Sequence, residues 1–136
     1  MRAVIDASVA VKWVLDEKGS DVALALQAEQ LTAPSLWLIE AANALWATAA
    51  RGQISAKETE ERLALLRRAP VETTPAEDDL ASALALANRL QHPVYDCIYL
   101  AAALRFDMEV ITADGRFFRA CGRDAKLAER VRLLGH

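Results

Sequence analysis

The sequence contains few cysteines and histidines, and neither residue type forms a metal-binding motif. Cys97 and Cys121 are isolated, without the spacing of zinc ligands or of a disulfide framework. His92 lies beside a proline and His136 is the last residue, and we assign neither a catalytic role. These absences argue against a zinc enzyme and against a disulfide-rich secreted domain, and they fit a protein of a reducing compartment.

Long apolar runs are also missing. No stretch approaches the roughly 18 residues of a membrane span. The apolar first residues include Asp6 and Lys12 and lack a cleavage site, so we expect no signal peptide, a cytoplasmic location and no membrane contact. The sequence has no internal repeat, low-complexity segment or linker, and its 136 residues suit a single domain over residues 1–136.

An overall excess of positive charge is missing as well, because the net charge is −3. Residues 101–136 nevertheless hold seven Lys and Arg against five Asp and Glu, whereas residues 1–100 hold nine against fourteen. Charge alone leaves two interpretations of the C-terminal third open, a phosphate-facing patch and an ordinary solvated surface. Its basic residues are Arg105, Arg116, Arg119, Arg123, Lys126, Arg130 and Arg132.

What the sequence does contain is a short apolar strand that ends in a carboxylate. Residues Ala3–Ile5 are typical of a buried β-strand, and Asp6 and the hydroxyl of Ser8 follow it. Ligands of open α/β sheets bind outside the carboxyl ends of the strands. Asp6 is therefore expected at the edge of the sheet where chemistry takes place.

The rest of the sequence alternates between expected strands and helices. Ser8 and Ser20 are expected helix caps, and two capping boxes start helices at Ser55 and Thr74. The alternation predicts an α/β fold in three layers, with a mostly parallel central sheet and helices on both faces. Further strands are expected at 31–33, 71–73, 109–112 and 131–134, and helices at 9–15, 21–30, 35–51, 55–69, 74–91, 96–104 and near 117–118.

Four acidic residues occupy similar places in these units. Asp6 and Asp114 follow strands, whereas Glu40 and Asp96 lie near the starts of helices that such strands precede. One strand order would bring all four to the same edge of the sheet. Taken singly, Asp96 has an alternative role as a helix cap and Asp114 as a turn residue. Asp6 is the hardest to explain structurally, because a charge beside a buried strand needs a partner.

Carboxylates gathered in this way predict a metal site. Like charges repel, and shared burial raises the pKa values of the acids. A divalent cation relieves the repulsion, and an all-oxygen donor set suits Mg²⁺ or Mn²⁺. A cation held in this way typically binds substrate phosphates, so the natural chemistry of the site is hydrolysis at phosphorus.

These residues resemble the motifs of a known family, the PIN-domain ribonucleases, and among them the VapC-type toxins of type II toxin–antitoxin systems. The resemblance covers nearly the whole chain. It rests on four segments in the family's order and at compatible spacing, each with one of the acids: Val4–Val9, Pro34–Leu45, Tyr95–Ala101 and Thr112–Phe117.

The resemblance implies an endoribonuclease that leaves 5′-phosphate and 3′-hydroxyl ends. It implies a PIN-like parallel sheet between helices, a homodimer, and a cognate VapB-type antitoxin that wraps around the toxin. The helices at 35–51 and 55–69, with Trp37 and Trp46, are candidates for the antitoxin groove. It further implies that Mg²⁺ or Mn²⁺ is held by Asp6, as the central ligand, with Glu40, Asp96 and Asp114, and that Ser8, Thr112 and Asn43 support the site.

Two rival interpretations remain. In a phosphohydrolase acting on small phosphate esters, Asp6 would be a nucleophile. Such enzymes commonly have a second Asp two residues further on, where this chain has Ser8. In a non-catalytic PIN-like module that binds RNA or a protein, the complete set of four acids would have no purpose. Both are therefore less favoured than the nuclease.

Overall fold

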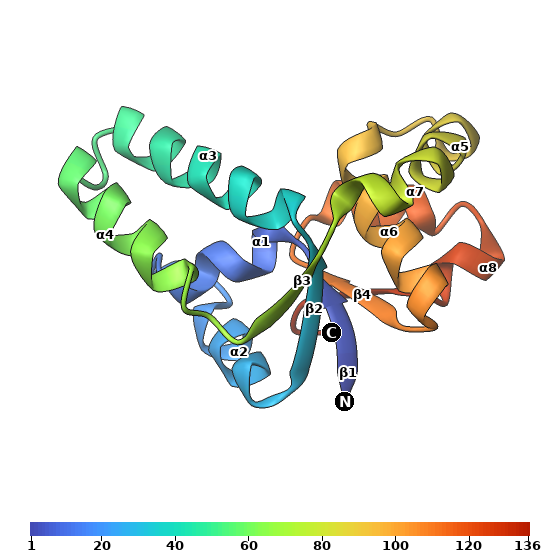
Figure 1. The fold of residues 1–136 in the computed structure, drawn as a ribbon, viewed down its shortest axis with the longest axis horizontal. Coiled ribbons are helices and arrows are strands. Elements are labelled where there is room, and N and C mark those ends of the chain that lie inside the picture. Colours follow the sequence, from blue (N-terminus) through green and yellow to red (C-terminus); the bar gives the residue numbers. More distant parts are fainter.

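A five-stranded parallel sheet forms the centre of the molecule (Figure 1). The computed structural model describes residues 1–136, and every neighbouring pair of strands in it is parallel. The middle strand is β1 (Arg2–Ile5), and its residues Ala3–Ile5 are almost completely buried. The order across the sheet is β3 (Val71–Thr74), β2 (Gln30–Pro34), β1, β4 (Glu109–Thr112) and β5 (Val131–Leu133).

Eight α-helices surround the sheet: α1 (Ala7–Ala10), α2 (Ser20–Ala25), α3 (Leu36–Ala50), α4 (Ala56–Leu66), α5 (Leu80–Leu90), α6 (Val94–Phe106), α7 (Gly115–Cys121) and α8 (Ala125–Ala128). Short 3₁₀ turns span Val11–Trp13, Leu26–Ala28 and Ala76–Asp79. No helix combines the length and the apolar character that crossing a membrane requires.

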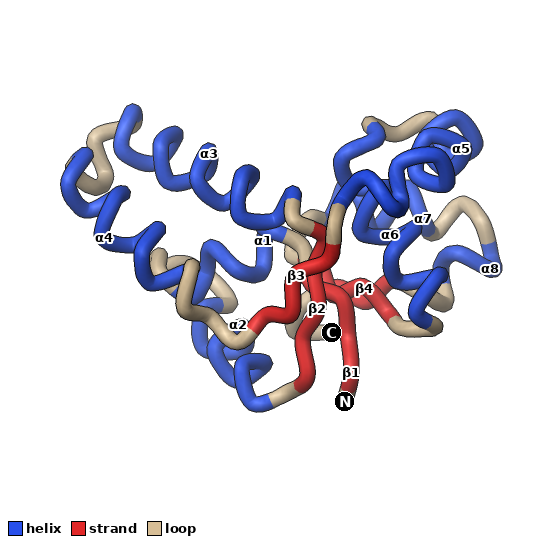
Figure 2. The backbone as a smooth tube through the Cα atoms, in the orientation of Figure 1, coloured by secondary structure: helices blue, strands red, loops and turns tan.

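The helices form two layers, one on each face of the sheet, which confirms the predicted fold class (Figure 2). From β1 through β2 to β3 the connecting helices α1–α4 lie on one face. The chain then crosses back to β4 and β5, and α5–α8 lie on the other face. Right-handed crossovers require this change of face when the chain reverses its direction across the sheet.

α6 packs against the middle of the sheet. Its residues Cys97–Ala103 are all buried, because the helix contacts β1, β2, β4 and α5. α6 ends just before β4 begins, so it runs antiparallel to the strands. Its first turn, which contains Asp96, therefore lies at the carboxyl edge of the sheet.

The order of connections reverses between β1 and β4. β1 leads to β2 on one side, whereas its other neighbour, β4, is reached only after β3. At such a switch point the segments leaving the two strands diverge to opposite faces, which opens a crevice at the carboxyl ends. Asp6 directly follows β1, and Asp114 lies two residues after β4. The first and the last predicted acids therefore both lie at this switch point.

Two of the predicted helix caps are wrong, because other groups occupy the cap positions. The Asp6 carboxylate accepts a hydrogen bond from the Val9 N–H at 3.3 Å, and Ser8 lies inside α1. Gly19, with φ of 87°, precedes α2, and the hydroxyl of Ser20 donates to a carbonyl of the preceding loop at 2.8 Å.

One predicted capping box is confirmed and the other is wrong. Ser55 and Glu58 exchange both expected hydrogen bonds, each 3.0 Å long, at the start of α4. Thr74 instead ends β3, where it pairs with Pro34 of β2, and a 3₁₀ turn separates it from α5. Strand pairing therefore overrides the local capping signal.

The ion pair between Arg105 and Asp79 allows a prediction about stability. Asp79 is 2% exposed, and Arg105 donates to both of its carboxylate oxygens, at 2.7 and 3.0 Å. Arg105→Ala leaves a buried carboxylate unpaired, so we expect the free energy of unfolding to fall by about 3 kcal/mol in urea denaturation.

The matched control for this prediction is Arg130→Ala. Arg130 pairs at 2.7 Å with Asp107, whose side chain is 85% exposed. Water already screens this pair, so we expect a loss below about 1 kcal/mol. Equal losses in the two variants would contradict the importance that we assign to the burial of Asp79.

Candidate active site

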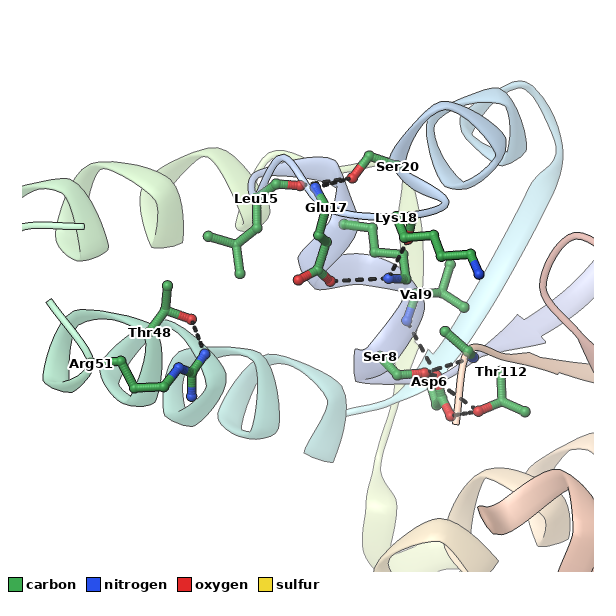
Figure 3. Close-up of polar contacts among 12 residues, drawn as sticks. Asp6, Ser8, Val9, Leu15, Glu17, Lys18, Ser20, Thr48, Arg51 and Thr112 are labelled. Atoms are coloured by element: carbon green, nitrogen blue, oxygen red, sulfur yellow. Dashed lines mark hydrogen bonds and ion pairs between the residues drawn. The ribbon is translucent and has the colours of Figure 1, made fainter. Parts of the chain in front are cut away.

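Asp6 stands immediately after β1, and donors from two segments hold its carboxylate (Figure 3). The Ser8 hydroxyl donates to Oδ1 at 2.5 Å, and the Val9 N–H donates to the same oxygen at 3.3 Å. The hydroxyl of Thr112, the last residue of β4, donates to Oδ2. Asp6 is only 3% exposed, so these bonds join the carboxyl ends of β1 and β4 inside the protein.

Burial raises the pKa of Asp6 from 3.8 to about 7. The negative charge of Asp96 raises the pKa further, whereas the hydrogen bonds from Ser8, Thr112 and the Val9 N–H favour the ionised form and offset part of the increase. A carboxyl group with such a pKa is only partly ionised at neutral pH. Strongly shifted carboxyl groups of this kind concentrate at functional sites.

Glu40 lies near the start of α3, and a hydrogen bond links it to α6. The Tyr99 hydroxyl donates to Oε1 of Glu40 at 2.5 Å. Burial raises the pKa of Glu40, the Tyr99 hydrogen bond lowers it, and the charge of Asp96 raises it. Because α3 and α6 cover opposite faces of the sheet, this bond passes over its carboxyl edge.

Asp96 lies in the first turn of α6, where it pairs with a histidine. Nε2 of His92 is 2.6 Å from Oδ2 of Asp96. Burial raises the pKa of Asp96, the contact with His92 lowers it, and the charge of Asp114 raises it. The residue preceding α6 is Pro93, and no side chain caps the helix. The alternative role of Asp96 as a helix cap is therefore not what the structure contains.

Asp114 does have a structural role, as the cap of α7. Its Oδ1 accepts hydrogen bonds from the backbone N–H groups of Arg116 and Phe117, at 2.9 and 3.5 Å. The Asp114 N–H in turn donates to the Thr112 hydroxyl at 3.0 Å. One carboxylate oxygen of Asp114 thus orients α7 and the other, Oδ2, accepts no hydrogen bond in the structure.

The four acids influence one another electrostatically, and Asp96 links them. Its charge raises the pKa of both Asp6 and Glu40, and the charge of Asp114 raises the pKa of Asp96. The structure thus brings together the acids from four separate segments. Asn43, by contrast, is exposed on α3 and forms no side-chain hydrogen bond.

The supporting hydroxyls connect Asp6 to the loop after β4. Oγ of Ser8 accepts from the Ala113 N–H at 2.8 Å while donating to Asp6. Thr112 similarly accepts from the backbone and donates to the carboxylate. Each hydroxyl therefore has a fixed donor direction, and the rotamer of Asp6 is determined by the backbone around it.

The chemistry of the donor set fits a hard divalent cation. The acids supply oxygen ligands only, and burial raises the pKa of the Cys97 thiol to about 11, so no thiolate competes. As the side chains are placed, no three Asp, Glu, His or Cys side chains lie at metal-ligating spacing. Hydroxyl, phenol and imidazole groups contact the carboxylates instead.

His92 is a site residue that the sequence analysis missed. Besides contacting Asp96, its ring lies 5.5 Å from the ring of Phe117, centre to centre, which holds it at the start of α6. The available signal was the spacing of four residues between His92 and Asp96. A proline between them obscured it, because Pro93 suggests a chain break and not a continuous face.

The chain belongs to the PIN domain family, whose members are in general nucleases. The family matches residues 3–123, which include all four acids. No curated protein sequence matches the chain.

Several solved structures share this fold, and two of them illustrate the likeness. PAE2754 from Pyrobaculum aerophilum has a TM-score of 0.67 and 21% identity, and the match covers 88% of this chain and 79% of that one. A toxin–antitoxin complex from Klebsiella pneumoniae has a TM-score of 0.58 and 21% identity, covering 85% and 89% of the two chains. At this identity the likeness shows a common fold.

The raised pKa of Asp6 predicts how stability depends on pH. The carboxyl pKa is about 7 in the folded protein and near 3.8 in the unfolded chain, so the contribution of Asp6 is most favourable below pH 3.8 and is lost as the pH rises through 7. Asp6→Asn removes this titration. We expect the variant to be more stable than wild type by about 1–2 kcal/mol at pH 8, and to lose most of that advantage at pH 5.

Urea unfolding in EDTA between pH 5 and pH 8.5 measures this effect. Asp107→Asn serves as the control, because its 85% exposed side chain should give a difference from wild type that hardly varies with pH. A pH-independent difference for Asp6→Asn would contradict the raised pKa of Asp6.

Proposed function

We propose that this protein is a metal-dependent endoribonuclease toxin of the VapC type, which hydrolyses RNA to 5′-phosphate and 3′-hydroxyl ends. The observation that carries the proposal is the Asp6 carboxylate, which is buried at the switch point of the sheet with its pKa raised to about 7. Membership of the PIN domain family supports the nuclease class. RNA as the substrate, and Mg²⁺ or Mn²⁺ as the cofactor, are parts of the proposal.

In this proposal some residues of the site bind the cation and others orient them. Ser8 and Thr112 fix the orientation of Asp6, Tyr99 orients Glu40, and His92 orients Asp96. A divalent cation held there would supply positive charge against the carboxylates and would make a bound water more acidic. The residues that we assign to holding it are Asp6, Glu40, Asp96 and Asp114.

We also propose a VapB-type antitoxin as the protein partner. The fold likeness to a chain from a toxin–antitoxin complex supports this class of partner. A groove of about 160 Å³ lies between α3 and α4, and its lining includes Leu45, Trp46 and Leu63. Trp46 is 66% exposed, and an exposed apolar patch of this kind marks interaction surfaces. An amphipathic antitoxin segment would bury it.

Trp37 does not contribute to this groove, contrary to the expectation from sequence. Its side chain is buried, and the indole N–H donates to the Thr73 hydroxyl of β3 at 3.1 Å. Trp37 therefore fixes α3 to the edge of the sheet. For the proposed homodimer, Leu80 and Leu84 of α5 offer a separate exposed apolar surface.

The cleavage reaction tests the proposed activity. Wild-type protein incubated with total RNA and Mn²⁺ or Mg²⁺ is expected to give fragments with 5′-phosphate ends, identified by ligation and sequencing, and EDTA is expected to stop the reaction. Asp6→Asn and Asp96→Asn should lower the rate by at least about 100-fold, because even residues that only orient metal ligands cost 10–100-fold.

Asp107→Asn is the matched control for cleavage. Asp107 follows α6 at the opposite edge of the sheet, and its φ of 55° is one that Asn tolerates. We expect it to cleave at the wild-type rate. Cleavage by Asp6→Asn at that rate would refute the assigned site, and absence of cleavage by wild type with either metal would refute the nuclease.

The groove between α3 and α4 allows a separate prediction about the antitoxin. If the reading frame next to this one encodes the partner, Trp46→Glu should weaken its binding by at least about 10-fold in calorimetry, because a buried aromatic anchor is replaced by a charge. RNA cleavage by the free protein should not change. Lys57→Glu, on the exposed side of α4, is the control, and equal affinities for the two variants would argue against this groove.

A further inference from the structure

The basic residues of the C-terminal third differ in whether an acid neutralises them. Arg116, Arg119 and Arg123 take part in no ion pair in the structure, although the acids of the proposed active site are close by. The three arginines that do form pairs, each 2.7–2.8 Å long, are Arg105 with Asp79, Arg130 with Asp107 and Arg132 with Glu109.

The unpaired arginines line a single cleft, whose volume is about 510 Å³. Arg116, Arg119 and Arg123 are three and four residues apart, so they share one face of α7 and of the turn after it. Asp96 of α6, Asp114 at the start of α7 and His92 line the same cleft. Apart from Pro93, every lining side chain is polar or charged, so the cleft suits a charged ligand and no apolar one.

Gly115 leaves room for the guanidinium of Arg119. A Cβ atom added at Gly115 would lie 2.9 Å from Nη1 of Arg119, which is too close for a side chain without a shift of the arginine. Arg119 thus folds back over the first turn of α7, toward the end that Asp114 caps. Arg119 lines the cleft together with Asp96 and Asp114 and forms an ion pair with neither, since the partner of Asp96 is His92.

We propose that this cleft binds backbone phosphates of the RNA strand next to the scissile bond, through Arg116, Arg119 and Arg123. The inference rests on the proposed nuclease function and deepens it. A guanidinium matches phosphate oxygens with two parallel hydrogen bonds, and groups left without an acid are free to do so. Because Asp96 and Asp114 line the same cleft, a strand held by the arginines passes beside these two acids.

The composition of the cleft also predicts how the strand is recognised. Phosphate contacts position a strand without reading its sequence, and six of the seven residues that line the cleft are charged or polar. Each arginine that neutralises a phosphate of a single strand changes the salt dependence of log K by about 0.7. The three arginines together should therefore contribute about 2 to the steepness with which log K falls against the logarithm of the salt concentration.

RNA binding without cleavage tests the proposal. We would measure fluorescence anisotropy of labelled 12-nucleotide oligo(U) and oligo(A) with the full-length protein in EDTA, over a range of KCl concentrations. The cleft variant is Arg116→Gln/Arg119→Gln/Arg123→Gln. The control is Lys57→Gln/Arg67→Gln/Arg68→Gln, which removes the same charge from exposed positions on and after α4.

The cleft variant should bind both oligonucleotides at least about 30-fold more weakly than wild type, with a salt slope about 2 smaller, whereas the control should change by less than about 3-fold. Thermal unfolding checks that both variants are folded. Equal binding by the two variants would overturn the proposal that this cleft binds phosphates. A loss of affinity for only one of the two oligonucleotides would overturn it as well.

Failure of the proposed phosphate cleft can be told apart from failure of the proposed nuclease activity. If wild type cleaves RNA and the cleft variant binds and cleaves as the control does, the cleft assignment is wrong and the nuclease stands. If wild type cleaves no RNA with either metal, the nuclease proposal fails, while the anisotropy comparison still decides whether the arginines bind phosphate.

Discussion

The hydrogen bond from Thr112 to Asp6 is the interaction on which the arrangement of the site depends. It connects the last residue of β4 to the residue after β1, across the point where the chain reverses its direction through the sheet. It also keeps a carboxylate inside the protein, where burial raises the pKa to about 7. A buried carboxyl group of this kind lowers stability at neutral pH, so it is most simply understood as a requirement of function.

The other acids reach Asp6 because of the strand order. β1 stands in the middle of the sheet, so the segments after β2 and β4 flank the segment after β1, and α6 crosses beneath all three strands. Each acid then needs only a position near the start of its helix or the end of its strand. The hydroxyl and imidazole groups set the direction of each carboxylate, and α7 continues the same edge with its row of arginines.

Much of the fold follows from local patterns in the sequence, and the site follows only in part. The apolar run Cys97–Ala103 predicts a buried helix because no face of it is polar, and the Ser55 capping box is local in origin. That Asp6 and Asp114 lie at one switch point is different, since it requires a strand order that sequence patterns leave undetermined. Thr74 shows the limit most clearly: its capping signal is real, but pairing with β2 decides its conformation. The unpaired state of the α7 arginines is likewise a property of the three-dimensional structure alone.

The hydrogen bond between Tyr99 and Glu40 joins helices that belong to opposite layers. Burial and the charge of Glu40 raise the pKa of Tyr99 above its usual range, so the phenol keeps its proton and can donate to Glu40. A ligand that moved Oε1 of Glu40 would break its hydrogen bond with Tyr99. A single phenol thus ties the two helical layers together at the end of the sheet where the acids lie, and it leaves only Oε2 of Glu40 without a protein donor.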